Sequence, residues 1–338
     1  MKRNFKFFLA ILIFLFSFYS FSESVENLFS DLTQELAEDK KIQTGCLYGL
    51  SSIPFASLKY ICEVHNYFPV NVNFYSSQKE IVSDFLNKKT AFIFVPYQTA
   101  LEILQAFPDE VVLSAIVQKS NVYLISAGEK INALSDLLGK TVSIPKDDMI
   151  CQKLFKWLCY QYGIPVNKGP RGITLNDLDT SAEIVPKIVN RSVKYAVLGE
   201  PYSGIAMKKN RKNFLSLDLQ KEFDSVIGKF SYFPETVMIV HRNFSHTKEF
   251  AAFSELLKKL FPYILKNPEE TALCNKMFNL PKTDEFSRLS LFNLNFCFVN
   301  DKSIFDELFL SSRVMTYTEA NSSYFTISEK NVFFTEAR

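Results

Sequence analysis

Residues 195–202 read Tyr-Ala-Val-Leu-Gly-Glu-Pro-Tyr, an apolar run that stops at a glycine and is followed by a glutamate and a proline. Four apolar residues suit a short buried strand, and the proline suits a first helical turn. A buried strand that leads straight into a helix is the basic unit of a parallel sheet covered by helices. Glu200, between the two elements, would then stand at the carboxyl end of the strand, where such sheets bind ligands.

The same order of strand and helix recurs along most of the chain. We predict further strands at residues 42–50, 70–75, 91–95, 111–117, 122–126, 141–144, 214–217 and 235–241. We predict helices at 25–40, 54–64, 78–86, 101–107, 133–138, from Asp147 or Asp148 to about 162, 182–189, 201–209 and 248–266. Two or three more helices follow, and residues 316–338 receive no assignment. This alternation indicates an α/β fold with mostly parallel sheets, and 338 residues indicate two domains.

The N-terminus has the pattern of an export signal. Lys2, Arg3 and Lys6 precede an apolar stretch from 7 to 21, and the small residues of 22–24 suit a cleavage site. A membrane span needs about 20 apolar residues, so this stretch is short for one. We therefore expect a signal peptide at 1–24 and a periplasmic or otherwise extracytoplasmic body. An uncleaved membrane anchor is the alternative.

Composition excludes several classes of function. The chain has 38 basic and 36 acidic residues, and the first 24 residues hold three basic residues and one acidic one, so the body is neutral. A neutral body gives no electrostatic footprint for nucleic acid. The six cysteines form no CxxC pair, and the three histidines do not cluster with them, so we expect no metal site and no cofactor. Export permits disulfides, but burial as small apolar residues is the expectation for most of the cysteines.

Residues that follow the predicted strands are the candidates for a binding site. Free N–H groups and hydroxyls near 51–53 can donate hydrogen bonds to an acceptor on a ligand, and the carboxylate of Glu200 can accept hydrogen bonds from an amino group. Aspartates at 147–148 occupy the positive end of a helix and argue against a strongly anionic ligand there. Helix capping and core packing are alternative roles for all of these positions. The candidate ligand-binding residues are Ser51, Ser52, Ile53, Tyr97, Asp147, Glu200, Tyr202, Tyr232 and Phe233.

No motif of a common enzyme class competes with these candidates. The chain contains no GxSxG, no GxxxxGK[ST], no HExxH and no GxGxxG sequence. We therefore expect a binding protein rather than an enzyme.

Three stretches resemble a known family. Residues 134–145, Leu-Ser-Asp-Leu-Leu-Gly-Lys-Thr-Val-Ser-Ile-Pro, are similar to its "dLkGKtVavp" segment, and residues 195–202 are similar to its "aavl.EPy" segment. Residues 91–96 fall where the family has the strand that closes the first crossover. The chain thus resembles the type II periplasmic binding proteins of the NMT1/THI5-like group. These are solute-binding proteins of ABC importers, among them sulfonate-, nitrate- and thiamine-precursor-binding proteins.

The resemblance implies two lobes joined by two crossings, with the ligand enclosed between them. Lobe 1 would comprise 25–120 plus 228–338, lobe 2 would comprise 121–227, and the hinge would lie near 118–121 and 227–232. It also implies a small-molecule ligand and an ABC permease as partners, and we expect a monomer. The Lys-Asp-Asp sequence after Pro145 departs from the family's small-residue turn, which favours an amine-bearing, thiamine-precursor-like heterocycle over an oxyanion.

Three other functions remain open at this point. A membrane-anchored sensing domain would keep the N-terminus uncleaved. Enzymes of menaquinone biosynthesis share the fold, although they are cytoplasmic and the export signal counts against them. A lobe that has lost its ligand and serves only as an interaction surface is the third.

Overall fold

The structure is a computed structural model that describes residues 41–64, 69–167, 169–228, 233–278, 294–301, 304–316 and 327–333. The predicted signal peptide, the predicted helix at 25–40 and the candidate Tyr232 lie outside the described residues, as does most of 316–338. Within the described ranges, no helix combines the length and the apolar character that crossing a membrane requires.

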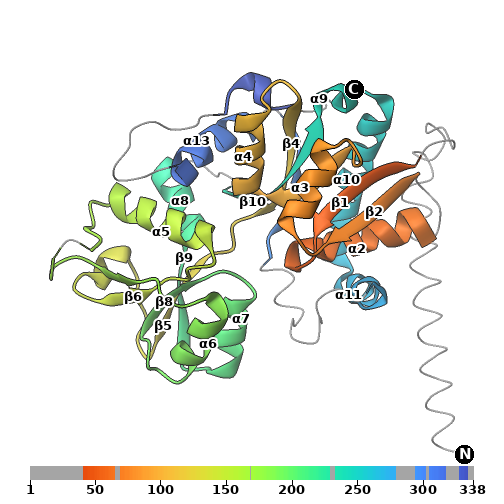
Figure 1. Cartoon of the computed structure of the whole chain (residues 1–338). Coiled ribbons are helices and arrows are strands. Elements are labelled where there is room, and N and C mark those ends of the chain that lie inside the picture. Colours follow the sequence, from red (N-terminus) through yellow and green to blue (C-terminus); the bar gives the residue numbers. More distant parts are fainter. Residues whose placement is uncertain are drawn as a thin grey trace, which may run out of the picture.

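The first of two lobes is built on a six-stranded sheet with the order β11-β4-β10-β3-β1-β2 (Figure 1). Its strands are β1 (Ile42–Leu47), β2 (Val70–Tyr75), β3 (Phe92–Pro96), β4 (Val111–Lys119), β10 (Pro234–His241) and β11 (Phe296–Val299). We call this sheet and its helices lobe 1.

Helices cover both faces of the lobe 1 sheet. One face carries α2 (Ile53–Lys59) and α10 (Lys248–Lys266), whose buried residues form one apolar core with the sheet. The other face carries α3 (Gln78–Leu86), α4 (Tyr97–Ala106) and α13 (Ile304–Thr316). Within the described ranges, lobe 1 also contains α9 (Arg242–Ser245) and α11 (Pro268–Met277).

The second lobe, lobe 2, is built on a five-stranded sheet with the order β7-β6-β8-β5-β9. Its strands are β5 (Tyr123–Ala127), β6 (Thr141–Ser143), β7 (Thr174–Asn176), β8 (Tyr195–Leu198) and β9 (Asn213–Asp218). Helices α6 (Ser181–Val189) and α7 (Tyr202–Lys209) pack on one face of this sheet. Helices α5 (Met149–Gln161) and α8 (Leu219–Ile227) contribute buried residues to the core on the other face.

Most strands of each sheet point the same way, as predicted, but the strands that follow the crossings do not. β10 is antiparallel to both β3 and β4, and β5 is antiparallel to both β8 and β9. After a crossing, the chain enters its new sheet at the strand ends that face the other lobe. The first strand after the crossing therefore runs away from the other lobe. The sheets are therefore mixed, because β10 and β5 oppose their neighbours and β11 is antiparallel to β4.

The two crossings lie side by side and are hydrogen bonded. The first runs from the end of β4 to the start of β5, and the second runs from the end of α8 to the start of β10, with 229–232 outside the described residues. The Ser120 N–H donates to the Phe233 carbonyl over 2.7 Å, and the Phe233 N–H donates to Oε1 of Gln220 over 3.1 Å. Helix α13 of lobe 1 also packs on α5 of lobe 2, so one apolar core continues from lobe to lobe.

Candidate functional site

Three carboxylates lie near one another where the lobes join. Asp148 and Glu200 belong to lobe 2, and Glu235 is the second residue of β10 in lobe 1. Both lobe 2 carboxylates act electrostatically on Glu235. We call these three residues the acidic cluster.

Asp148 holds the start of helix α5. Its Oδ1 accepts a hydrogen bond from the Cys151 N–H over 2.9 Å, which caps the helix as predicted for Asp147 or Asp148. Its Oδ2 lies 3.2 Å from the place where a Cβ on Gly199 would stand. The glycine that ends β8 therefore lets the strand end approach the carboxylate closely.

Glu200 is buried at the end of β8, as the strand-then-helix pattern predicted, with 6% of its surface exposed. Its N–H donates to Oδ1 of Asn121 over 3.1 Å, and its Oε2 accepts from the Gly204 N–H over 3.2 Å. The second bond places the carboxylate at the first turn of α7, where the helix dipole favours a negative charge. Glu200 thus caps a helix and also faces the crossing.

Glu235 was not among the candidates from the sequence. Burial, the nearby charge of Asp148 and, more weakly, that of Glu200 raise its pKa from 4.5 to about 8, although a hydrogen bond from the Asn121 backbone opposes the shift. Its Oε2 is fully buried and has no hydrogen-bond partner. The available sequence signal was a carboxylate at the start of a strand that is otherwise mostly apolar. That residue is expected at a site rather than in a core.

Asn121, in the first crossing, bonds residues of both lobes, Glu200 through its side chain and Glu235 through its backbone. Only 2% of its surface is exposed. Its Oδ1 accepts from the Glu200 N–H, while its Nδ2 is buried without a hydrogen-bond partner. A buried donor left unpaired costs about 1–3 kcal/mol, so such a group indicates a missing partner.

The candidates around residues 51–53 lie at the end of β1. The Ser52 hydroxyl donates to the Gly49 carbonyl over 2.6 Å, so it closes its own turn. Ser51 is half-buried, and Ile53 is fully buried in the lobe 1 core. Of these three residues, Ser51 keeps the most exposed side chain.

Tyr97, at the end of β3, is fully buried. Its hydroxyl donates to the Leu308 carbonyl over 2.8 Å and lies 3.4 Å from the Ser311 hydroxyl, so it anchors helix α13. The tyrosine thereby supports the helix that packs on lobe 2.

Replacing Tyr97 by Phe should lower the free energy of unfolding by about 1 kcal/mol, because one buried hydrogen bond is lost. Thermal melts should show a decrease of about 2–4 °C, and affinity for the bound ligand should not change. Tyr160→Phe is the control, because that side chain is 61% exposed. A Tyr97→Phe variant with normal stability and impaired binding would instead support the ligand-binding role that the sequence predicts for Tyr97.

The three remaining candidates, Asp147, Tyr202 and Phe233, lie in different surroundings. Oδ1 of Asp147 accepts from the Ser181 N–H over 2.8 Å and so ties the start of α6 to the loop after β6. Tyr202 is half-buried, and burial together with the charges of Asp147 and Asp148 raises its pKa. Phe233 is fully buried in the second crossing, with its ring 5.2 Å from that of Phe223. The structure thus brings Glu200 and Tyr202 near the aspartates, and it puts Phe233 into the core between the crossings.

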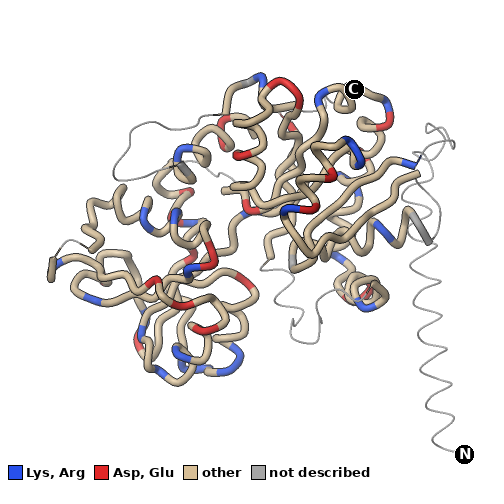
Figure 2. Tube along the Cα trace, in the orientation of Figure 1, with Lys and Arg blue, Asp and Glu red and all other residues tan. Residues whose placement is uncertain are grey.

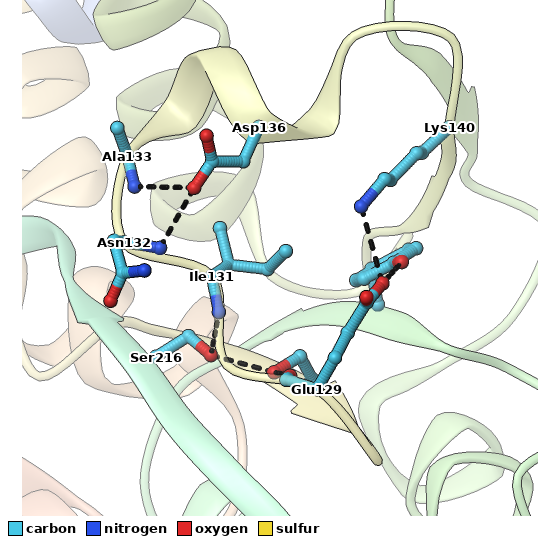
Figure 3. A network of polar contacts seen from close by, with 9 residues as sticks. Glu129, Ile131, Asn132, Ala133, Asp136, Lys140 and Ser216 are labelled. Atoms are coloured by element: carbon cyan, nitrogen blue, oxygen red, sulfur yellow. Dashed lines mark hydrogen bonds and ion pairs between the residues drawn. The ribbon is translucent and has the colours of Figure 1, made fainter.

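Residues of the 134–145 stretch take part in a network of polar contacts (Figure 3). Oδ2 of Asp136 accepts from the N–H groups of Asn132 and Ala133 over 3.0 and 3.1 Å. Lys140 pairs with Glu129 over 3.2 Å. These contacts shape the turn before β6, at the amino end of the strand and away from the acidic cluster.

A pocket of about 620 Å³ opens in lobe 1 at the amino ends of β1 and β3. Its lining includes Gln43, Thr90, His241 and Arg242 and none of the candidate residues. The pocket therefore lies at the opposite end of the strands from the acidic cluster.

The cysteines are mostly buried, as predicted. None of the six cysteines, all of which lie in the described ranges, forms a disulfide; five of them are buried, and Cys297 is half-buried. Within the described part of the chain, no three His, Cys, Asp or Glu side chains form a group that could hold a metal ion. Charges of both signs are spread over both lobes (Figure 2).

Two sheets, two adjacent crossings and a reversed strand after each crossing define the two-lobed fold of periplasmic solute-binding proteins. Solved structures with this fold include an ABC transporter protein from Parabacteroides distasonis, with a TM-score of 0.65 and 18% identity over 83% of this chain and 94% of that one. The periplasmic aliphatic sulphonate binding protein SsuA from Escherichia coli aligns with a TM-score of 0.59 and 13% identity over 82% of this chain and 85% of that one.

The alkanesulfonate-binding protein SsuA from Xanthomonas axonopodis pv. citri, bound to MOPS, aligns with a TM-score of 0.54 and 12% identity over 83% of this chain and 96% of that one. No protein-family model matches this chain, and no curated protein sequence does. At these identities the likeness is one of fold, and the residues at the site must be interpreted from their own chemistry.

Proposed function

We propose that this protein is the extracytoplasmic solute-binding component of an ABC importer, which captures a small molecule between its lobes and presents it to a membrane permease. The observation that carries the proposal is the meeting of polar groups from both lobes at the crossings. A ligand that contacts Glu200 in lobe 2 and Glu235 in lobe 1 binds the closed arrangement more tightly than the open one. That difference in affinity is what drives closure.

The ligand that we favour is a flat, amine-bearing heterocycle similar to a pyrimidine precursor of thiamine. Glu200 supports this choice, because a buried carboxylate at a strand end can accept hydrogen bonds from an amino group. Tyr202 next to it offers an aromatic surface.

The direct test is to purify the protein without denaturation and to identify co-purifying small molecules by native mass spectrometry. A single bound molecule, released on denaturation, is the expected result. Sequencing of the mature N-terminus completes the test, since export predicts a start near residues 23–25. An intact Met1 would instead support the membrane-anchored alternative.

Glu200→Gln should weaken binding of an amine-bearing ligand about tenfold or more, because a charge-assisted hydrogen bond becomes a neutral one. Isothermal titration with the identified ligand measures the change. Glu102→Gln, on the exposed surface of α4, is the matched control. Unchanged affinity in Glu200→Gln would remove Glu200 from the site.

A further inference from the structure

One end of lobe 2 carries a dense run of basic residues. From 186 to 217 the sequence has seven Lys and Arg residues and one acidic residue, Glu200, which is buried at the crossing. Four of the seven fall within five positions, and we call these four residues the basic turn: Lys208, Lys209, Arg211 and Lys212. All four side chains are exposed, and none of them forms an ion pair with another residue that the structure describes.

The basic turn lies where α7 passes into β9, at the end of lobe 2 that is farthest from the crossings. Strand β5 begins just after the first crossing, and its last residue, Ala127, pairs with Asn213, the first residue of β9. The turn before Asn213 is therefore a strand length away from the junction of the lobes. A partner that distinguishes the open from the closed arrangement must contact both lobes, so the basic turn suits a partner that binds either arrangement.

An asparagine, and not the cationic side chains, holds this turn in shape. Oδ1 of Asn210 accepts from the Lys212 N–H over 3.0 Å, and its Nδ2 donates to the Val189 carbonyl over 2.8 Å. The dipole of α7 favours the two lysines in its last turn, but Arg211 and the Lys212 side chain lie beyond the helix. The contacts of the described residues thus give the charges of these two side chains no structural role.

Two exposed apolar side chains follow the basic turn. Phe214 and Leu215 are 39% and 37% exposed. They belong to β9, which is the last strand of the lobe 2 sheet and pairs with β5 on one side. Neighbours in a strand point to opposite faces, so these two side chains flank the edge of the sheet. An exposed apolar edge of this kind is a place where proteins contact another surface.

We infer that the basic turn, together with Phe214 and Leu215, binds a membrane surface that carries anionic lipid headgroups. Each basic side chain close to such a surface raises the affinity about fivefold. Aromatic and aliphatic side chains enter the boundary between headgroups and acyl chains. A lipid surface therefore accounts for both features of this end of lobe 2, its cations and its apolar pair.

This inference goes beyond the proposed function and does not depend on the ligand. The contact is reversible and confined to one end of lobe 2, so it leaves the junction of the lobes free. It would hold the protein close to the membrane in which the proposed permease lies.

The test is co-sedimentation of the exported protein, residues 25–338, with lipid vesicles. Vesicles of equal parts phosphatidylglycerol and phosphatidylcholine are compared with vesicles of phosphatidylcholine alone. The salt concentration is about 0.1 M and then about 1 M, which shortens the screening length from about 10 Å to about 3 Å. We expect the anionic vesicles to bind the protein about tenfold or more tightly at the lower salt concentration, and we expect this preference to disappear at the higher one.

Replacing the whole basic turn should weaken binding to the anionic vesicles about a hundredfold. The substitutions are Lys208→Gln, Lys209→Gln, Arg211→Gln and Lys212→Gln. The matched control removes the same net charge at four exposed lysines of lobe 1 and should bind almost as the unmodified protein does: Lys41→Gln, Lys79→Gln, Lys88→Gln and Lys276→Gln.

A second variant, Phe214→Ala with Leu215→Ala, keeps every charge and should weaken binding to the anionic vesicles about tenfold, because apolar surface no longer enters the membrane boundary. Thermal melts of all variants show whether they remain folded.

Equal binding to anionic and neutral vesicles, or equal losses in the basic-turn variant and its lobe 1 control, would overturn the inference. If the basic turn bound a poly-glutamate peptide while the vesicles stayed unbound, the surface would serve an acidic protein instead, and the inference would also fail. Neither outcome affects the capture function, because the basic turn lies at the opposite end of lobe 2 from Glu200.

Discussion

Replacing Asn121 by Asp is expected to lower the melting temperature by about 10 °C at pH 8, since a buried unpaired charge costs about 3–5 kcal/mol and each kcal/mol is worth about 2–4 °C in a domain of this size. The two side chains have nearly the same shape. Aspartate keeps the acceptor that the Glu200 N–H requires. The difference is a fourth carboxylate beside Asp148, Glu200 and Glu235, and the first two already disfavour the charged form of Glu235.

The loss should depend on pH in a defined direction. Burial and three carboxylates raise the folded-state pKa of the introduced aspartate above its unfolded value of about 4. A raised pKa means that stability is complete below the unfolded pKa and is lost as the pH rises through the folded one. The difference between Asn121→Asp and the unmodified protein should therefore be small near pH 4 and largest at pH 8.

Thermal melts from pH 4 to pH 8 measure this difference. Asn132→Asp, at an exposed position, is the control and should melt within 2 °C of the unmodified protein at every pH, because exposed substitutions change stability by about 0.5 kcal/mol or less. Adding Glu235→Gln to Asn121→Asp should restore part of the loss, because one repelling charge is removed. A loss of equal size at all pH values would mean that packing, and not charge, dominates at this position.

Long periodic elements could be predicted from the sequence because their signal is local. Helix α10 was predicted at 248–266 and is observed with those bounds, since its apolar residues recur at helical spacing over nineteen positions. Strand β7 has three residues and gave no comparable signal. Helix α8 was also missed, although Asp218 caps its start and Gly228 ends it with a φ of 74°. Both capping residues were visible in the sequence, but the apolar pattern between them was short.

The acidic cluster could be predicted only in part, because two of its determinants are long-range. Glu200 was a candidate because a carboxylate after a buried strand is conspicuous in the local sequence. Asn121 and Glu235 belong to the cluster only because the two crossings bring residues of distant segments close together. The spacing of residues along a single segment cannot predict such a long-range contact.

Phe92→Ala is expected to destabilise the protein by about 3–5 kcal/mol, because it opens a cavity among packed aromatic rings. Phe92 is fully buried in lobe 1, and its ring lies 4.4 Å from Phe253, 5.9 Å from Phe94 and 6.1 Å from Phe244. The matched control is Phe214→Ala in β9 of lobe 2, where the side chain is 39% exposed. That control should destabilise the protein less than Phe92→Ala does, because part of the Phe214 ring already contacts water and its removal leaves no closed cavity.

The informative readout of Phe92→Ala is the comparison of two probes. Circular dichroism reports on helices of both lobes, whereas the fluorescence of Trp157 reports on α5 of lobe 2 alone. Because α13 of lobe 1 packs on α5 and one apolar core continues through both lobes, we expect both probes to shift together. If Trp157 kept its original melting temperature, the lobes would be separate cooperative units. Closure between them would then be a rigid-body motion about the crossings, without support from the α13–α5 contact.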